Sequence, residues 1–306
     1  MGAKRNKMNI TVIGEANIDI AVRQREPSNG KGCSPANIRF HHGGVARNVA
    51  HNLCLLGHKV KLMTVFGDDD FASRLIDDCK EIGMDLSLST HYKDARSPIF
   101  LCFNDEWGQM QSAFSDIDLN DHFNLDWMRD KIDAVNRSDL VVADTLLSAE
   151  AFTYLIDHCA VPLYIDTVSP KRALLLSEAI KQSRKKTFFA VKCNLAEAQA
   201  LTGITEAEKA ARQLNAKGIE NVYLTLGKDG AIYCSNNNLL HFPAMETEIV
   251  NVTGSGDAFL AGVVHGHAIG LSGEEAVKIG LKMAQLNTES EAPVNPALRH
   301  STVLCC

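Results

Sequence analysis

The sequence lacks the features that mark membrane proteins and nucleic-acid-binding proteins. Its 31 Lys and Arg residues are outnumbered by 37 Asp and Glu residues, and the formal net charge of -6 at pH 7 argues against a basic surface for nucleic acid. No apolar run approaches the roughly 20 residues that a bilayer-spanning helix needs. We therefore expect neither a nucleic-acid partner nor a membrane partner.

The nine cysteines form no C-x-x-C pair of the kind found in metal sites and redox motifs. The start of the chain has no secretory signal pattern, so we expect reduced thiols and a cytoplasmic location. Gly2 fits a myristoylation signal, but Asn6 stands where that signal needs Ser or Thr, and the final Cys305 and Cys306 do not fit the prenylation pattern. We therefore expect no lipid anchor.

What the sequence does contain is a regular alternation of strand-like and helix-like segments. Of its 306 residues, 45% are hydrophobic, which is enough for a large core. Apolar runs such as "NITVIGE" and "VKLMTVFG" are each followed by a segment with helical spacing, and Gly57 and Gly83 stand where two of those helices should end. The alternation predicts an α/β fold with a mostly parallel sheet covered on both faces. Such sheets bind ligands at the carboxyl ends of their strands.

Two stretches interrupt this alternation. Residues 96–114 predict two strands around a turn from Asn104 to Gly108, and residues 34–41 contain a short strand just before a pair of glycines. The pattern alone fits either ordinary edge hairpins or a small β-sheet that projects from the main one. Because no internal repeat or inter-domain linker is evident, we expect one domain over residues 8–300 with these strands inserted.

The most distinctive motif is "VTGSGDAF", a glycine-rich turn that leads directly into an apolar helix. Gly254, Ser255 and Gly256 can direct several backbone N–H groups at one point, with the positive end of the helix dipole behind them. That arrangement predicts an anion hole with Asp257 at its edge. Asp is also a common cap near helix N-termini, and this motif alone favours capping. It matches neither the P-loop nor the dinucleotide fingerprint.

Two earlier motifs suit a ligand with hydroxyl groups. Asn17 and Asp19 follow the first apolar run and face the same way in an extended chain. A carboxylate beside an amide suits a pair of vicinal hydroxyls, although both residues are also common in turns. Gly43 and Gly44 precede a helix with Asn48 near its start, so a ligand can approach the backbone there. A simple glycine turn explains the same residues.

Two later motifs suit a nucleotide. Asn194 and Glu197 lie three apart at a predicted helix start, which fits a capping box and also fits an amide and an acid beside magnesium-bound phosphates. In the second case the acid acts through water, because Mg²⁺ usually keeps several waters. "LTLGKDGA" places Thr225 at a strand end, before Gly227 and Gly230. This is either a hairpin turn or a turn that contacts a nucleotide.

Taken together and in this order, the motifs resemble the PfkB (ribokinase-like) family of carbohydrate and nucleoside kinases. The resemblance covers roughly residues 10–298. Within the family, "SPANIRFHHGGVARNVAHNLCLLG" and "LNTESEAPVNPAL" are similar to stretches of the pseudouridine kinases. Ribokinases more typically read G-G-K-G-A-N, whereas this chain has Val45 and Arg47 there, which disfavours free ribose as the acceptor.

The resemblance implies a three-layer α/β/α fold with a small β-sheet lid over the acceptor site. It implies transfer of the γ-phosphoryl group of ATP to a sugar hydroxyl, here the 5′-OH of pseudouridine, with Mg²⁺. It also implies an anion hole at Gly254–Gly256 with Asp257 as the base, a water-mediated contact of Glu197 with Mg²⁺, and pairing of two subunits through lid strands. The acceptor would be held by Asn17, Asp19, Gly43, Gly44 and Asn48. The nucleotide would be lined by Asn194, Thr225, Gly227 and Gly230.

Several points remain open at this level. Kinases of ribose or adenosine are alternatives, and so is a non-catalytic sugar- or nucleoside-binding regulator on the same fold. Glu15 and Ser255 stand where relatives often have smaller residues or Ala, and Asn251 stands where many have Asp, which leaves activation by a monovalent cation such as K⁺ open. Asp257 at a helix N-terminus predicts a low carboxyl pKa.

The residues that would recognise a base are not identified by any motif. Arg39, Ser97 and Phe103 lie in or beside the two inserted stretches and are candidates for that part of the lid.

Overall fold

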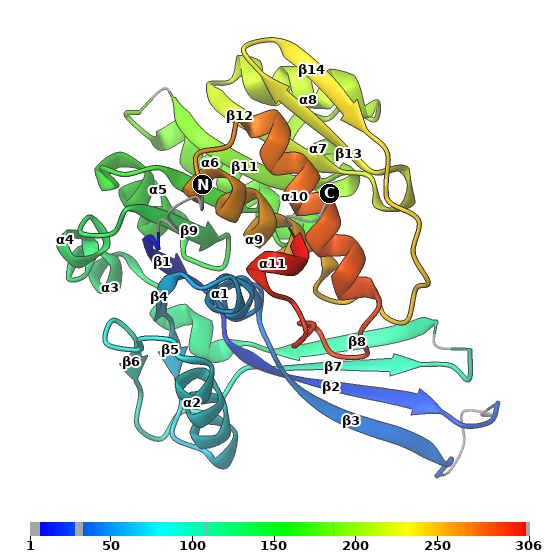
Figure 1. The fold of residues 1–306 in the computed structure, drawn as a ribbon. Coiled ribbons are helices and arrows are strands. Elements are labelled where there is room, and N and C mark those ends of the chain that lie inside the picture. Colours follow the sequence, from blue (N-terminus) through cyan, green and yellow to red (C-terminus); the bar gives the residue numbers. More distant parts are fainter. Residues whose placement is uncertain (1–6, 28–32, 108, 186, 304–306) are drawn as a thin grey trace.

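The computed structural model describes residues 7–27, 33–107, 109–185 and 187–303. It confirms the predicted α/β fold: a sheet of eight strands is covered by helices on both faces, and a smaller sheet of four strands projects from it (Figure 1). Gly2, Asn6, Gly108, Cys305 and Cys306, which carried predictions above, lie outside the described residues.

The large sheet has the strand order β14-β13-β12-β11-β10-β9-β1-β4. Neighbouring strands from β12 to β4 run parallel, whereas β13 and β14 add an antiparallel edge. Its strands are β1 (Asn9–Ile13), β4 (Lys59–Met63), β9 (Leu140–Asp144), β10 (Leu163–Asp166), β11 (Phe188–Asn194), β12 (Ile219–Thr225), β13 (Ala231–Ser235) and β14 (Asn238–Phe242).

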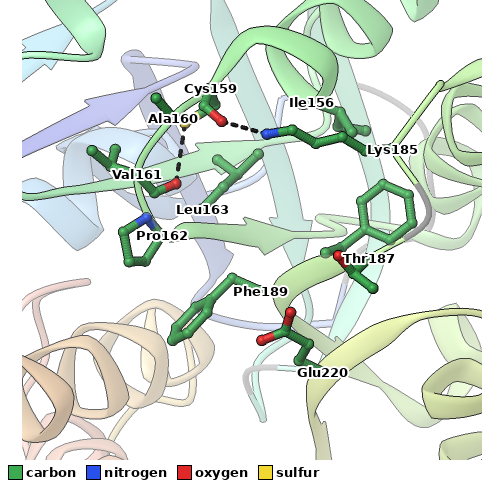
Figure 2. Close-up of a pocket in the computed structure, with 11 residues that line it drawn as sticks. Ile156, Cys159, Ala160, Val161, Pro162, Leu163, Lys185, Thr187, Phe189 and Glu220 are labelled. Carbon is green, nitrogen blue, oxygen red and sulfur yellow. Dashed lines mark hydrogen bonds between the residues drawn. The ribbon is translucent and has the colours of Figure 1, made fainter.

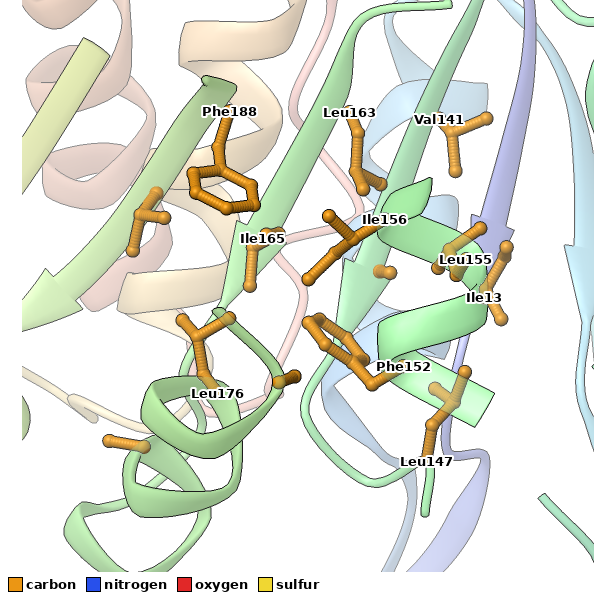
Figure 3. Close-up of a cluster of buried hydrophobic side chains, with 14 of the residues drawn as sticks. Ile13, Val141, Leu147, Phe152, Leu155, Ile156, Leu163, Ile165, Leu176 and Phe188 are labelled. Carbon is orange, nitrogen blue, oxygen red and sulfur yellow. The ribbon is translucent and has the colours of Figure 1, made fainter. Parts of the chain in front are cut away.

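The apolar runs form strands because both faces of the sheet are buried. Along β1, Ile10 and Val12 enter one cluster of buried side chains while Ile13 enters the other. Figure 3 shows part of the second cluster, in which Phe152 and Leu176 from two helices pack beside Ile165 of the sheet. This two-sided burial makes the three-layer arrangement.

The helices divide between these two faces. Residues of α1 (Val45–Leu55), α2 (Asp70–Ile82), α9 (Ser255–Ala268), α10 (Gly273–Thr288) and α11 (His300–Val303) enter one buried cluster. Residues of α3 (Leu125–Arg129), α4 (Ile132–Val135), α5 (Ala149–His158), α6 (Pro170–Gln182), α7 (Leu195–Thr202) and α8 (Ala207–Ala216) enter the other. Short 3₁₀ helices are η1 (Asp118–His122) and η2 (Gly227–Asp229). The predicted helix end at Gly83 is confirmed, with Gly83 in the left-handed conformation.

The smaller sheet, called the lid below, has the order β3-β2-β7-β8. The strands predicted within 34–41 and 96–114 are observed as β3 (Ala36–Gly43), β7 (Ile99–Asn104) and β8 (Met110–Asp116). The prediction missed β2 (Asn17–Gln24), which follows β1 after only three residues and has a half-exposed pattern. Asn17 and Asp19 therefore lie on a lid strand. A separate parallel pair joins β5 (Val65–Phe66) to β6 (Thr90–His91).

Over the described ranges, none of the helices combines the length and the apolar character that crossing a bilayer demands. Within the described ranges the cysteines are free thiols, namely Cys33, Cys54, Cys79, Cys102, Cys159, Cys193 and Cys234.

Candidate active site

The N-terminus of α9 lies at the centre of the site. Gly254 precedes the helix in a left-handed conformation with φ 75°, and a Cβ there would collide with the carbonyl oxygen of Pro293. Gly254 has no side chain to cap the helix, and within the described chain the backbone amides of Gly256 and Asp257 have no hydrogen-bond acceptor. These amides are free to bind an anion.

Asp257 is buried, and its Oδ2 accepts a hydrogen bond of 2.9 Å from Nδ2 of Asn48. Burial raises the pKa of Asp257 to about 7, and the neighbouring carboxylates of Asp166 and Asp19 act in the same direction. The prediction of a low pKa from the helix terminus is therefore wrong. Loss of water and the nearby negative charges outweigh the helix dipole and the hydrogen bond from Asn48.

Asn17 and Asp19 face the same side of β2, as predicted. A Cβ added to Gly43 would collide with the carboxylate of Asp19 and would lie 2.6 Å from Oδ1 of Asn17, so both side chains lie directly over that glycine. Gly44, with φ 95°, leaves no room for a Cβ because the carbonyl oxygen of Glu15 is too close. Burial raises the pKa of Asp19 to about 6. The two glycines are thus required where the lid strand meets α1.

Asn194 and Glu197 form the predicted capping box at the start of α7. The Oε2 atom of Glu197 accepts hydrogen bonds of 2.8 Å from the Asn194 amide and 2.6 Å from Oγ1 of Thr167. Its Oε1 accepts one of 2.7 Å from Nδ2 of Asn194. Both carboxylate oxygens are therefore engaged within the protein.

The turn after β12 is the predicted hairpin into β13. Oγ1 of Thr225 donates to the carbonyl oxygen of Cys193, and Thr225 pairs in register with Asn194 of β11. Gly227 and Gly230 both have positive φ, and a Cβ at Gly230 would collide with the backbone of β14. This turn therefore lies beside the start of α7 at the same edge of the sheet.

Sequence reasoning missed the ion pair beneath α9. Nζ of Lys192 lies 3.0 Å from Oδ2 of Asp166, and both side chains are almost completely buried. A Cβ added to Gly256 would lie 2.9 Å from Nζ of Lys192, so the ammonium sits against the first turn of α9. Burial alone would lower the pKa of Lys192, but the carboxylates of Asp166, Glu197 and Asp257 raise it. A lysine inside the apolar run of β11 was the available signal.

A second group of buried acids was also missed. Oδ2 of Asp144 accepts a hydrogen bond of 2.9 Å from the Glu15 amide, and Oε1 of Glu15 accepts one of 2.7 Å from Nδ2 of Asn120. Burial raises the pKa of Glu15, and it raises that of Asp144 to about 7. These side chains lie at the carboxyl ends of β1 and β9, next to Asp19, so this end of the site is strongly acidic.

The lid candidates have different surroundings. Arg39 forms an exposed ion pair of 2.6 Å with Glu291, and Phe103 stacks edge-on with Phe114. Ser97 is buried and donates a hydrogen bond of 2.6 Å to Asp69, the residue that caps α2. Ser97 thus contributes to the cap of α2.

Asn251, in the loop before α9, is held at both ends of its side chain. Its Nδ2 donates a hydrogen bond of 2.9 Å to the carbonyl oxygen of Glu291, and its Oδ1 accepts one of 3.0 Å from the Thr253 amide.

A surface hollow lies at the amino ends of the central strands β10 and β11, the ends opposite to those that carry the site. Figure 2 shows it beside Leu163, at the start of β10, with Lys185 donating to the carbonyl oxygen of Cys159. Since the residues described above lie at the carboxyl ends of the strands, this hollow is not part of their site.

Comparisons with known proteins agree with this geometry. The chain is 28% identical to the pseudouridine kinase of Escherichia coli (strain K12), over 98% of this chain and 96% of that protein. It is 27% identical to the guanosine-inosine kinase of Exiguobacterium acetylicum, over 90% of this chain and 92% of that protein. The ribokinase of Arabidopsis thaliana, solved with ribose and ATP, has the same fold, with a TM-score of 0.81, 20% identity and coverage of 97% and 98% of the two chains.

The family model described as pfkB family carbohydrate kinase matches residues 7–299. Nearly the whole described chain lies inside that match. The protein is therefore a phosphotransferase that acts on an alcohol group, and it belongs to the pfkB family of carbohydrate kinases.

Proposed function

We propose that this protein transfers the γ-phosphoryl group of ATP to the 5′-OH of pseudouridine. The observation that carries the proposal is the buried carboxylate of Asp257, held by Asn48 beside two unpaired backbone amides of α9. A base next to an anion hole is what phosphoryl transfer to a hydroxyl needs, because the reaction depends on positioning and charge stabilisation.

In the proposed reaction, the acceptor oxygen forms a bond to the γ-phosphorus while the bond from that phosphorus to the β–γ bridging oxygen breaks. The hydroxyl proton passes to the carboxylate of Asp257, and ADP leaves with the bridging oxygen. The pKa of about 7 matches Asp257 to this task, because a base is most effective when its pKa lies near the working pH.

The acceptor would bind between Asp257 and the start of the lid. Over Gly43 and Gly44, the carboxylate of Asp19 would accept hydrogen bonds from vicinal hydroxyls, and the amide of Asn17 would both donate to them and accept from them. Asn17 supports this role because its Oδ1 is buried without a hydrogen-bond partner among the described residues. An acceptor hydroxyl would supply the missing donor.

The phosphates would lie over the first turn of α9. We propose that the turn of Gly254, Ser255 and Gly256 forms the anion hole, with the free amides of Gly256 and Asp257 as donors, and that Lys192 adds its charge beneath them. Backbone groups approach closest where no Cβ intervenes, which fits the glycines of this turn. Asn194, Thr225, Gly227 and Gly230 would line the rest of the nucleotide.

A magnesium ion would come with the phosphates. Among the residues the structure describes, no three or more His, Cys, Asp and Glu side chains are grouped to hold a metal ion. Glu197 already uses both oxygens, so a water-mediated contact fits it better than direct ligation. Bound Mg²⁺ would neutralise charge on the transferring phosphoryl group.

The choice of pseudouridine is supported by the first of the curated relatives above and by the local motifs. Another relative is named for different acceptors, since the protein from Exiguobacterium acetylicum is a guanosine-inosine kinase. Initial rates of ADP formation with pseudouridine, uridine, adenosine, guanosine, inosine and ribose would decide among them, with product identified by mass. Turnover of ribose or adenosine without turnover of pseudouridine would contradict the substrate assignment. No ADP formation with any acceptor would favour a non-catalytic regulator.

We further propose that the lid pairs two subunits. Strand register places Val22 opposite both Ile38 and Phe103, and Leu101 opposite Phe114, on one face of the lid. Ile38 is 59% exposed and Phe114 is 62% exposed, so this apolar face is open to solvent. A second copy of the chain is the proposed partner.

Two minor proposals complete the function. A monovalent cation such as K⁺ would bind near Asn251, and comparing rates in potassium chloride with rates in choline chloride tests this. The protein would act in the cytoplasm, and fractionation of its native cells would test the location.

A further inference from the structure

Asn48 connects the proposed base to a second, deeper contact. Its Nδ2 donates to Asp257, and its Oδ1 accepts a hydrogen bond of 3.2 Å from Nη1 of Arg47. Both Arg47 and Asn48 are 4% exposed. The amide is therefore held from both ends, by the base on one side and by its own neighbour in the chain on the other.

Arg47 is in turn fixed by two other elements. Its Nη2 donates a hydrogen bond of 2.6 Å to Oδ2 of Asp78 on α2, and its Nη1 also donates to the carbonyl oxygen of His42 on β3, at 3.2 Å. Nδ1 of His42 lies 3.0 Å from Oδ1 of Asp78. A continuous chain of contacts thus runs from Asp78 through Arg47 and Asn48 to Asp257.

The chemistry of arginine decides which way the Asn48 amide points. A guanidinium group has only donors, so the atom of Asn48 that faces Arg47 must be its carbonyl oxygen. The NH₂ group must then face Asp257. Without Arg47 the amide could turn and accept a hydrogen bond from the protonated carboxyl group of Asp257, which would favour the protonated form.

We propose that Arg47 is a positioning residue, which holds the Asn48 amide with its NH₂ group toward the carboxylate of Asp257. The proposal rests on the proposed role of Asp257 as the base. Asp78 anchors Arg47, so the anchor lies on α2, an element that contributes none of the groups proposed to touch the substrates. Arg47 also stands where ribokinases typically have a small residue, so this connection belongs to this chain's own motif.

Other titratable groups lie near Arg47 and near Asp257, and the test must separate their effects on the pKa of Asp257 from that of Arg47. Arg47 is faced by His42, Asp78 and Cys79, by Asp19 on β2, and on its own helix by His51 and Cys54. Asp257 is faced by Asp166, Lys192 and Asp19. Burial, with the charge of Arg47, lowers the pKa of His51 to about 3, so His51 is neutral near pH 7. The hydrogen bond from Asn48 favours the ionised form of Asp257.

The test compares Arg47→Met, Asp78→Asn and the control Asp77→Asn in the full chain. Asp77 is exposed on the same helix as Asp78 and loses the same charge when changed to Asn. The pKa of Asp257 is measured directly by carboxyl-carbon NMR, with the resonance assigned from Asp257→Asn. The pH profile of kcat/KM is measured in parallel, and thermal unfolding checks that each variant folds.

We expect Arg47→Met to raise the pKa of Asp257 by about one unit, the scale of a lost hydrogen bond to a charged group. The acid limb of kcat/KM moves to higher pH by the same amount, and activity recovers at alkaline pH. Asp78→Asn gives a smaller shift in the same direction, and Asp77→Asn gives none. A purely structural role would lower activity equally at every pH and leave the pKa in place.

An unchanged pKa in both Arg47→Met and Asp78→Asn would overturn the proposal. Should Arg47→Met fail to fold, Asp78→Asn decides alone, because its partly exposed side chain can be replaced with less disturbance. The NMR measurement needs no turnover. If the parent protein phosphorylates no acceptor, the proposed function fails while the effect of Arg47 on Asp257 is still measured.

Discussion

Lys192 of β11 lies opposite Asp166, the last residue of β10, and the two form an ion pair of 3.0 Å beneath the first turn of α9. The negative charges of Glu197 and Asp257 also act on the ammonium of Lys192 and raise its pKa. Three carboxylates around one cation leave this region with excess negative charge in the absence of a ligand. Burial, with the negative charge of Asp166, raises the pKa of Asp257 and so makes it a stronger base than an ordinary aspartate.

Replacing Asp257 by Asn should lower kcat by about 10²–10⁴, the usual scale for loss of a general base. The amide keeps the shape of the carboxylate but cannot take the acceptor's proton. Steady-state rates of ADP formation measure the effect, with the exposed Asp133→Asn as the control. Near-normal turnover by Asp257→Asn would remove Asp257 from the role of base.

The rate should also depend on pH in a defined direction. Because the base works only when ionised, kcat/KM should rise with pH through about 7, the pKa of Asp257, and level off above it. Below that pH the carboxyl group is protonated and cannot accept the acceptor's proton. A kcat/KM profile that stays level well below pH 7 would contradict this prediction, because kcat/KM reports the pKa of Asp257 in the free protein.

Gly256→Ala should damage the anion hole without unfolding the helix. The added Cβ would lie 2.9 Å from Nζ of Lys192 and would displace the ammonium from the first turn. We expect kcat to fall by about 10²–10³, the scale for losing one group that stabilises the transition state. Ser255→Ala is the matched control, and we expect it to be mild. Equal activities of the two variants would argue against a tight phosphate site here.

Phe114→Glu should dissociate a dimer that is formed through the lid. A charge on this exposed apolar face removes the driving force for pairing. Sedimentation velocity of the parent protein, of Phe114→Glu and of Leu174→Glu measures the oligomeric state, since Leu174 is another exposed apolar residue on α6. A parent protein that sediments as a monomer would contradict the proposed pairing.

The main sheet was predictable because its strands are buried on both faces and therefore appear as apolar runs of the right length. The helix ends at Gly57 and Gly83 were predictable for another reason, since both glycines adopt the positive φ that ends a helix. β2 was not predicted, although Ile18, Ile20 and Val22 recur at every second position along it. Because it follows β1 after only three residues, the sequence reads as the end of the β1 run, and its pairing with β3 and β7 shows that it belongs to the lid.

The residues of the candidate site also fall into a predictable group and a group that the sequence did not indicate. Motifs singled out Asn17, Asp19, Asn48 and Asp257 as candidates, because each lies in a short glycine-containing stretch. They did not single out Lys192, which lies inside the buried strand β11, or Asp144, which ends the buried strand β9. The pKa of Asp257 could not be predicted from its helix position, since Asp166 and Asp19 raise it from distant parts of the chain. Local sequence describes the helix dipole, and only the fold describes the burial.

Asn17 and Asp19 are the first and third residues of β2, where the chain leaves the large sheet and enters the lid. Asp257 is fixed to the core by α9. Any rotation of the lid would therefore change the separation between the groups that would hold the acceptor and the group that would take its proton. The affinity for the acceptor is then coupled to the angle of the lid. A ligand that closes the lid must bind the closed form more tightly than the open form, by at least the free energy that closure costs.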